Sequence, residues 1–393
     1  MPKTVILGTA RTPIGKLGGG LSTLPATELG GIAIAAALER AAVEPEQVDH
    51  VVMGQVLQAG QGQIPSRQAQ LNAQIPKETT SETVNKVCAS GLRAAVILDQ
   101  AIRGGDVEVG VGGGMESMSG APYLLPQARF GYRMGDARAL DAMVHDGLTN
   151  PFSGKQMFVE ATETSEQFEL TRADLDRWAL RSHELALAAI DEGRMSDEIV
   201  PVTVKGRKGD TVIEVDEGPR RGSSLEALAK LPGLHGKDGS HTAGNSPGVN
   251  DGAGALVLAS DEWAEANHKE ILAEILAHAQ TAGDTAILQT TPALSAMKAL
   301  DRAGLQPSDI DLWEINEAFA SVTLQSMRML GIDEARVNVN GGAVALGHPI
   351  GASGARIIGA LVQQLRRRGG GLGLAAICSG GGQGDALILK VHG

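Results

Sequence analysis

The chain has 393 residues, of which 42% are apolar and 20% charged, a composition typical of a globular protein with two or three domains. Its formal net charge of −12 argues against wrapping of nucleic acid, and no apolar run approaches the roughly 20 residues of a membrane span. We therefore expect neither a nucleic-acid nor a membrane partner. With two cysteines and no signal-peptide core at the N-terminus, the expected location is cytoplasmic.

The first part of the chain alternates short apolar runs with longer helical patterns. The runs at 4–7, 51–53 and 107–111 have the length of strands. The stretch 92–102 is apolar nearly all round, as expected for a helix that is buried between layers. Because this alternation is typical of sheets covered by helices, we predict an α/β layered fold.

Cys88 directly precedes this buried helix, within the segment Asn85–Gly91. Free N–H groups and the positive end of the helix dipole favour a thiolate there, and the small neighbours leave room for a ligand. Cys88 is therefore a candidate nucleophile. On this observation alone the alternative stays open, namely a cysteine that serves as a small buried apolar residue at a helix start.

The segment 121–242 differs in character from the regions around it. Residues 171–174 are typical of a helix N-terminus, and the helix that follows through Trp178 and His183 carries alternating charge. We predict that this segment is an insertion that forms a solvated cap.

The C-terminal part of the chain repeats the N-terminal part. Residues 38–49 align without a gap on 300–311, and the helical stretch 355–365 corresponds to 92–102. Two related halves would pack these two helices face to face. The predicted units are an N-terminal half at 1–120 completed by 243–268, an inserted domain at 121–242, and a C-terminal half at 269–393.

Asn316 and Glu317 follow the predicted strand 311–315 and place an amide and a carboxylate at its edge. Asn316 is a candidate to bind a water or a carbonyl group. The structural alternative is that Asn316 caps the next helix while the helix dipole favours Glu317, and the two roles are compatible.

His348 lies in the glycine-rich segment 341–354. Because Pro349 disfavours helical geometry in the residue before it, we expect His348 at the mouth of the following helix, in the position that mirrors Cys88. A histidine that caps a tight turn is the alternative. The duplication favours a Cys–His pair instead.

Cys378 ends the predicted strand 372–377, and the amides of 379–381 would form a nest that binds an oxyanion. Two thiols and an imidazole would then converge. A zinc site and a redox pair are weak alternatives because the sequence has no close-spaced pair such as CxxC, so we expect no metal. It also has no GxGxxG or Walker pattern for a nucleotide cofactor.

Taken together, these segments resemble the thiolase family over essentially the whole chain. The segments that carry the resemblance are Met53–Ala69, Asn85–Gly91, Gly113–Ser119, Asn316–Ala320, Gly341–Gly354 and Cys378–Gly384. Within the family the similarity is greatest to the acetyl-CoA acetyltransferases, the acetoacetyl-CoA thiolases. It implies the thiolase fold, reversible Claisen acyl transfer among acetyl-CoA, acetoacetyl-CoA and CoA, and no metal or redox cofactor.

The resemblance also implies a role for each candidate residue. Cys88 would be the acetylated nucleophile, His348 its base, and Cys378 the acid–base group for the second substrate. Asn316 would hold a water, and the amides of Cys88 and Gly380 would bind an oxyanion. The implied CoA contacts are Leu148, Met157, Arg220, Ala243, Gly244, Ser246, Ala318 and Phe319. The inserted domain would cover CoA, and the chain would assemble as a homotetramer, a dimer of dimers.

The chain departs from the family pattern near the expected substrate. Pro247 replaces a serine of the family's TAGNAS loop, so Ser246 is expected to take over the contact of that serine with the substrate. Arg220 is expected at the nucleotide phosphate of CoA. Gln156 replaces a histidine, and Leu288 stands where short-chain members carry methionine. A broader-chain 3-ketoacyl-CoA thiolase of fatty acid β-oxidation is therefore the alternative function, and a non-catalytic acyl-CoA binding protein is a weaker one.

Overall fold

The structure, a computed structural model, describes residues 2–393 and is built around one large mixed sheet. The strands of this sheet are β1 (Thr4–Arg11), β2 (Gly15–Lys16), β3 (His50–Gly54), β4 (Thr80–Val84), β5 (Val109–Ser117), β10 (Asn250–Ser260), β11 (Ala273–Ala282), β12 (Leu312–Ile315), β13 (Gly370–Ser379) and β14 (Gln383–His392). Their order is β12-β13-β14-β11-β1-β10-β5-β3-β4, with β2 paired to β10. Strands of the two halves therefore meet where β1 pairs with β11.

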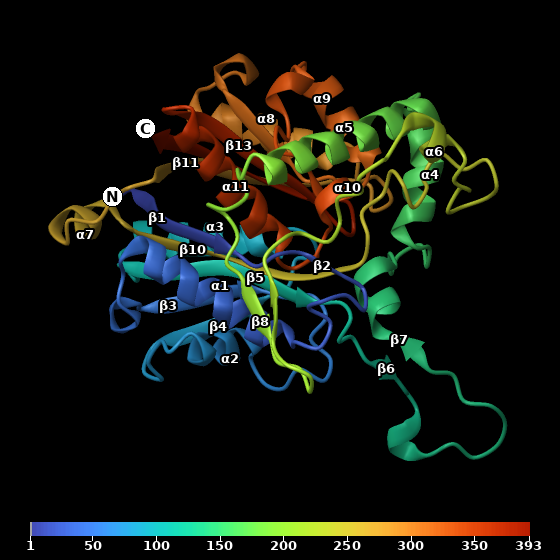
Figure 1. Ribbon diagram of the computed structural model, residues 1–393, viewed down its shortest axis with the longest axis horizontal. Helices are drawn as coiled ribbons and strands as arrows, with labels where there is room; N and C mark the ends of the chain where they lie inside the picture. The colour runs from blue at the N-terminus through green and yellow to red at the C-terminus, as the bar shows by residue number, and fades with distance from the viewer. Residues whose placement is uncertain (1) are drawn as a thin grey trace.

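Helices cover both faces of this sheet (Figure 1). The helices outside the inserted segment are α1 (Ala26–Ala41), α2 (Pro65–Asn72), α3 (Ser90–Gly104), α7 (Asp261–Ala266), α8 (Thr291–Ala303), α9 (Ala320–Leu330), α10 (Ala343–Leu346) and α11 (Ser353–Arg367). In β1, Ile6 belongs to the apolar core beside α3 and α11, whereas Val5 and Leu7 belong to the core under α1. Because successive side chains of a strand point to opposite faces, one strand supplies two cores.

The helices α3 and α11 lie against each other at the centre of the molecule. Their first turns come so close that an added Cβ on Gly91 would lie 2.8 Å from the amide nitrogen of Ala355. A Cβ on Gly354 would lie 2.1 Å from the amide nitrogen of Leu92. The contact therefore requires glycine on both helices. The prediction of two buried helices packed face to face is confirmed.

The repeat seen in the sequence is also a repeat in the structure. Ala42 caps the C-terminus of α1 and Gly304 caps that of α8, and both of these residues have the left-handed conformation. Each helix is followed by a short 3-10 turn, Pro45–Gln47 in one half and Pro307–Asp309 in the other. The aligned segments thus adopt the same succession of elements.

The inserted segment lies in sequence between the neighbouring strands β5 and β10. Its elements are β6 (Tyr123–Leu124), β7 (Leu140–Asp141), a π-helical turn (Met143–Leu148), α4 (Met157–Gln167), α5 (Arg172–Asp191), β8 (Val202–Val204), β9 (Thr211–Ile213) and α6 (Leu225–Ala229). Figure 1 shows β6 and β7 on an arm that projects from the body. The remaining short turns are Ala128–Phe130 and Glu334–Arg336.

The prediction of a solvated cap is wrong for α5. Trp178 is fully buried and donates its indole N–H to Glu317 over 3.0 Å, and the Ser182 hydroxyl donates to the other oxygen of Glu317 over 2.8 Å. His183 is buried as well. Arg177, Glu184 and Asp191 of α5 are exposed, but the opposite face of the helix packs against α9 and α10 of the C-terminal half.

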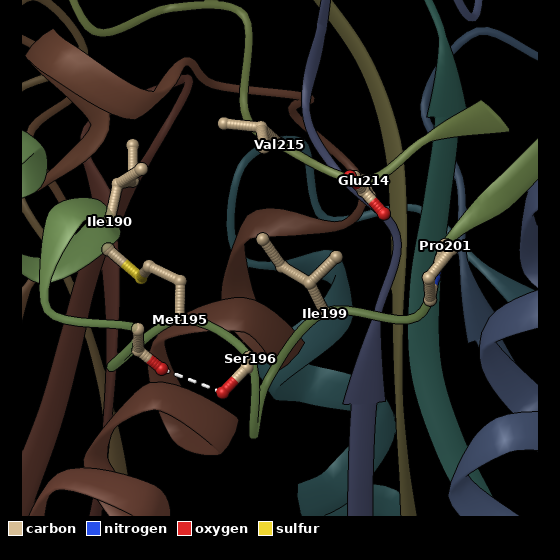
Figure 2. A pocket seen from close by; sticks show the side chains of 8 residues that line it. Ile190, Met195, Ser196, Ile199, Pro201, Glu214 and Val215 are labelled. Atoms are coloured by element: carbon tan, nitrogen blue, oxygen red, sulfur yellow. Dashed lines mark hydrogen bonds between the residues drawn. The ribbon is translucent and has the colours of Figure 1, made fainter.

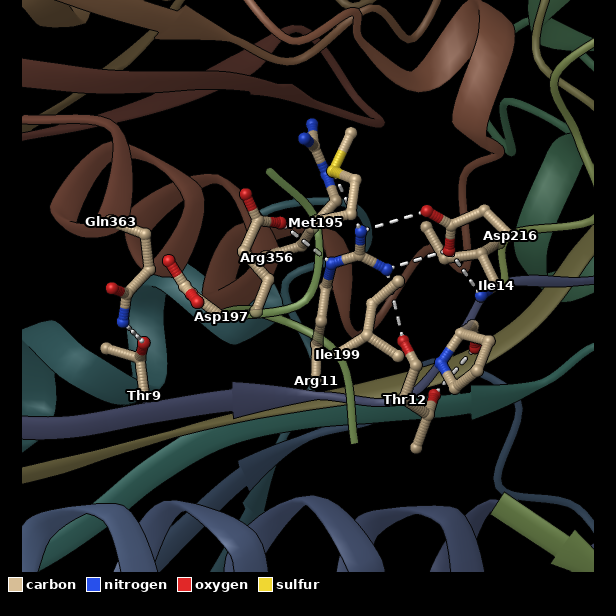
Figure 3. Close-up of polar contacts among 12 residues, drawn as sticks. Thr9, Arg11, Thr12, Ile14, Met195, Asp197, Ile199, Asp216, Arg356 and Gln363 are labelled. Atoms are coloured by element: carbon tan, nitrogen blue, oxygen red, sulfur yellow. Dashed lines mark hydrogen bonds and ion pairs between the residues drawn. The ribbon is translucent and has the colours of Figure 1, made fainter. Parts of the chain in front are cut away.

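A buried arginine ties the inserted segment to β1 (Figure 3). Arg11 donates to both oxygens of Asp216 over 2.7 and 2.9 Å, and its Nε donates to Glu198 over 2.9 Å. Burial alone would lower the pKa of Arg11, but the two carboxylates raise it above its ordinary value. The charge is therefore retained, and two points of the insertion are fixed to the N-terminal half. Across residues 2–393, no helix combines the length and the apolar character needed to cross a membrane.

Candidate active site

A cavity of about 250 Å³ lies between the two halves and the inserted segment. Its lining residues are Cys88, Met118, Leu148, Gln156, Met157, Phe158, Leu234, Ser246, Pro247, Gly248, Val249, Leu288, Ala318, Phe319, His348 and Ile350. The walls are mostly apolar, but a thiol and an imidazole both reach the cavity. Cys88 and His348 remain only 4% and 6% exposed, so water is largely excluded from them.

Cys88 sits in a strained turn between β4 and α3. Val87, directly before it, has a φ of +44°, a left-handed conformation that is costly for a β-branched residue. The main-chain N–H groups of Cys88 and Gly380 point to the sulfur and lower its pKa, but burial has the larger effect and raises the pKa of Cys88 to about 12. The thiol is therefore protonated at neutral pH and needs a base to become a nucleophile.

His348 is held so that one ring nitrogen is free. Its Nδ1 lies 2.6 Å from the Ser353 hydroxyl, whose own proton is donated to the carbonyl of Pro349 over 3.1 Å. With the hydroxyl proton of Ser353 on the Pro349 carbonyl, Nδ1 donates the ring proton to Ser353, and Nε2, which is buried without a partner, has a free lone pair. Burial lowers the pKa of His348 to about 3, which keeps the ring neutral. Such an imidazole can accept a proton at Nε2.

Cys378 lies at the end of β13 and is fully buried. It packs with Leu288 and Ala318, which line the cavity, and with Val322 behind them. Burial and the nearby Cys88 thiol raise the pKa of Cys378 well above its ordinary value. The structure thus brings both thiols to the same place, and neither is ionised at rest.

Asn316 follows β12 and is fully buried, yet neither its amide nitrogen nor its amide oxygen has a partner. Buried amides normally form hydrogen bonds, so this group is suited to a water or a ligand atom. The alternative that Asn316 caps the next helix is wrong, because α9 begins at Ala320 and has no side-chain cap. Glu317, in contrast, accepts bonds from Asn338 and from the Val344 amide as well as from α5.

The residues predicted to contact CoA fall into two groups. Five of them line the cavity, namely Leu148, Met157, Ser246, Ala318 and Phe319. Ser246 has a buried hydroxyl without a partner. Arg220, Ala243 and Gly244 lie outside the cavity, with the guanidinium of Arg220 exposed and 3.4 Å from the carbonyl of Ala243.

Arg220 belongs to a second hollow of about 230 Å³ that it lines together with Lys16. This hollow shares Gly248 and Val249 with the cavity, so the two are neighbours. Two cations therefore lie beyond one wall of the apolar cavity.

Sequence reasoning missed the residues that hold the candidate groups. Asn250 accepts the main-chain N–H of His348 over 2.9 Å, and Ser353 orients its ring. Buried Glu116 accepts the N–H groups of Val56, Leu57 and Gly351 and so joins the two halves. The duplication contained a signal for Ser353, because Ser90 occupies the same place in the other half and donates to the carbonyl of Val87 over 2.7 Å.

A separate hollow of about 320 Å³ contains none of the candidate residues (Figure 2). It lies between the end of α5 and the segment 195–215 and is lined mainly by apolar side chains. The hydroxyl of Ser196, which lines this hollow, donates a hydrogen bond to the carbonyl of Gly193 over 2.7 Å. In the part of the chain that the structure describes, no three His, Cys, Asp or Glu side chains form a group able to hold a metal ion.

Two thiols, a neutral imidazole with a free nitrogen, and main-chain N–H donors lie together near the starts of two related helices. This arrangement is suited to acyl transfer through a cysteine nucleophile. A model of the thiolase N-terminal domain matches residues 4–262, and one of the thiolase C-terminal domain matches residues 269–391. The chain belongs to the thiolase family.

Individual relatives are similar over nearly their full length. The chain is 48% identical over 390 residues to the acetyl-CoA acetyltransferase of Pseudomonas aeruginosa and 45% identical over 392 residues to that of Syntrophomonas wolfei, with 99% of each chain covered in both cases. The crystal structure of the Bacillus anthracis acetyl-CoA acetyltransferase superposes with a TM-score of 0.97 at 40% identity, covering 100% of this chain and 99% of that one. The predicted thiolase fold is thereby confirmed.

Proposed function

We propose that this protein is an acetyl-CoA C-acetyltransferase, which condenses two acetyl-CoA to acetoacetyl-CoA and CoA, or runs the reverse thiolysis, through an acetyl group on Cys88. The observation that carries the proposal is the free Nε2 of His348 in the same mostly apolar cavity as the Cys88 thiol, with Cys378 packed against its wall. Relatives that are 45% and 48% identical carry this name. The catalytic residues are then Cys88, His348 and Cys378.

The first step is transfer of an acetyl group to Cys88. Since the pKa of Cys88 is about 12 and that of His348 about 3, the thiolate and imidazolium do not coexist at rest. The proton therefore moves to Nε2 of His348 as the sulfur attacks the thioester carbonyl. The N–H groups of Cys88 and Gly380 stabilise the oxyanion, and the C–S bond to CoA then breaks. The departing CoA thiolate takes the proton of Cys378.

The second step joins the two acetyl groups. Cys378, now a thiolate, removes a proton from the methyl group of a second acetyl-CoA, whose enolate oxygen is stabilised by protonated His348 and by a water on Asn316. The carbanion attacks the carbonyl of acetyl-Cys88, and the Cys88–acetyl bond breaks. The Cys88 sulfur recovers its proton from His348, so both thiols and the imidazole return to their starting forms.

The substrate is proposed to enter along the apolar cavity. Leu148, Met157, Ala318 and Phe319 would contact the pantetheine arm, with the partnerless hydroxyl of Ser246 bonded to one of its amides. The remaining expected contacts are Arg220, Ala243 and Gly244. Arg220 and neighbouring Lys16 have the charge to pair with phosphates of CoA beyond the cavity wall. CoA thioesters are substrates here, and the proposal includes no metal or redox cofactor.

Short acyl chains fit this site better than long ones. Cys378 is enclosed by Leu288, Ala318 and Val322, and the cavity of about 250 Å³ must also hold the end of pantetheine. This packing favours the acetyl-transferring function over the broader-chain 3-ketoacyl-CoA thiolase. A cytoplasmic homotetramer that serves fatty acid metabolism completes the proposal.

Intact-protein mass spectrometry after mixing with acetyl-CoA tests the function directly. We expect one acetyl adduct that maps to Cys88, disappears on addition of CoA, and is absent from Cys88→Ser. Folded protein without an adduct on Cys88 would refute the proposed nucleophile. Comparison of kcat/KM for four-carbon and longer 3-ketoacyl-CoA then separates the two thiolase functions.

A further inference from the structure

Lys86, two residues before the nucleophile, enters a buried polar cluster that the mechanism above does not use. Its ammonium donates to the Asp385 carboxylate and, over 2.6 Å, to the side-chain carbonyl of Gln280. The side chain of Lys86 is 13% exposed and that of Asp385 is 0% exposed. A buried ion pair of this kind is costly to form and is not explained by stability alone.

The side-chain partners of Lys86 both belong to the C-terminal half. Asp385 on β14 lies opposite Gln280 on β11 and opposite Ile377 on β13. The next pair in the β13–β14 register is Cys378 with Gly384. Lys86 therefore bonds to the sheet one residue pair away from the second catalytic cysteine.

The main chain of Lys86 makes the same connection. Its carbonyl accepts the hydroxyl of Ser379, the residue after Cys378, and its N–H donates to Ser90 at the start of α3 over 2.8 Å. Lys86 is thus bonded to the helix that follows Cys88 and to the hairpin that carries Cys378.

A firm attachment is needed here because the turn is strained. Val87 holds a left-handed φ of +44°, and such conformations are costly for a β-branched residue and persist only where the surroundings enforce them. Val87 also lies against Gly380, at which an added Cβ would come within 3.3 Å of its side chain. Val87 thus lies beside the residue whose N–H meets the sulfur of Cys88.

We infer that Lys86 and Asp385 are positioning residues that lock the Cys88 turn onto the Cys378 hairpin, so that the two thiols and the Gly380 amide are aligned for acyl transfer. This inference rests on the proposed function. Lys86 and Asp385 lie outside the catalytic set, and the two thiols that they align come from different halves of the chain. A misplacement of about 1 Å in such a site can cost roughly 100-fold in rate.

The test compares Lys86→Met with the double variant Lys86→Met/Asp385→Leu. Lys86→Met removes the cation that is bonded to the buried carboxylate of Asp385 and leaves only the more distant charges of Arg93 and His278. We therefore expect a lower Tm and a kcat for thiolysis that falls by roughly 10- to 100-fold, with KM nearly unchanged. The double variant removes that carboxylate and should regain Tm, whereas kcat should stay low. A merely structural role predicts that kcat recovers together with Tm, and that result would overturn the inference.

Arg103→Met is the matched control. Arg103 also connects α3 to the C-terminal half, by a bond to the carbonyl of Ile275 over 2.7 Å, and it pairs with Asp99 of its own helix over 2.8 Å, but it lies at the far end of α3. It should lower Tm while kcat is retained. An equal loss of kcat in Arg103→Met would overturn the inference. If wild-type protein forms no acetyl adduct on Cys88, the proposed function fails instead, whatever the variants do.

Discussion

The two halves of the molecule use the same structural device at the starts of α3 and α11, with different results. In each half a serine in the first turn bonds back to the preceding loop, Ser90 to Val87 and Ser353 to Pro349. In the first half the loop presents a thiol after a strained residue. In the second half the Ser353 hydroxyl also accepts a hydrogen bond from Nδ1 of His348, which leaves Nε2 of the ring without a proton. The two halves thus share the same helix start, and the second half differs in that its serine also orients a histidine.

Replacement of Cys88 by alanine removes the nucleophile of the first half and should have the largest effect. We expect kcat for thiolysis of acetoacetyl-CoA to fall by at least about 10⁴-fold, because the covalent route is lost. Tm should stay near the wild-type value, since the substitution leaves only a small void. A much smaller fall of kcat in steady-state assays of the variant would show that the reaction does not pass through acetyl-Cys88.

His348→Gln removes the base of the second half and should be the next most damaging change. Loss of a general base costs about 10²- to 10⁴-fold, and we expect the loss in the rate of Cys88 acetylation measured by rapid-quench mass spectrometry. Alkylation of Cys88 at high pH, where the thiol ionises without help, should be affected much less. Equal losses in both measurements would indicate a disrupted fold rather than a missing base.

Replacement of each of the two serines by alanine tests this comparison of the two halves most directly. Ser353→Ala removes the partner of Nδ1 of His348, so kcat should fall by about tenfold, equivalent to a hydrogen bond of about 1.4 kcal/mol. Ser90→Ala removes bonds to Lys86 and Val87, and we expect a loss of about 1–2 kcal/mol in the free energy of unfolding. Kinetics and chemical denaturation of both variants distinguish the roles. Equal effects of the two substitutions on kcat would contradict the distinction.

Leu288→Ala should enlarge the space beside Cys378. One methylene in an apolar pocket changes selectivity by about 10- to 200-fold, so the ratio of kcat/KM for six-carbon to four-carbon 3-ketoacyl-CoA should rise by at least about tenfold. Val322→Ala, which lies behind the pocket wall, serves as the control. An unchanged ratio in Leu288→Ala would mean that another residue limits chain length.

The pH dependence of kcat/KM should be the smallest effect. The base loses its free nitrogen only as pH falls toward about 3, and the thiol ionises only as pH rises toward about 12. Between these limits His348 and Cys88 each keep one protonation state, so neither group should change kcat/KM across the neutral range. A fall of kcat/KM at acid pH with its inflection near 6.5, the ordinary pKa of histidine, would show that His348 is more hydrated than its burial implies.

The sequence alone was informative about local patterns. Periodicity predicted the layered α/β fold, and the repeat placed Cys88 and His348 at equivalent helix starts, because both signals depend on residues close in the chain or on alignment of one half with the other. Strand ends also indicated Cys378 and Asn316, and the family motifs added the role that each is expected to have.

Only the tertiary structure decided which side chains meet. Trp178 lies on a helix whose charges suggested a solvated surface, yet its indole is buried against Glu317. The bond between Lys86 and Asp385 joins residues 299 positions apart. Such contacts depend on sheet register and helix packing, which local periodicity does not encode. The free nitrogen of His348 is likewise set by hydrogen bonds of Ser353, and those bonds exist only in the folded loop.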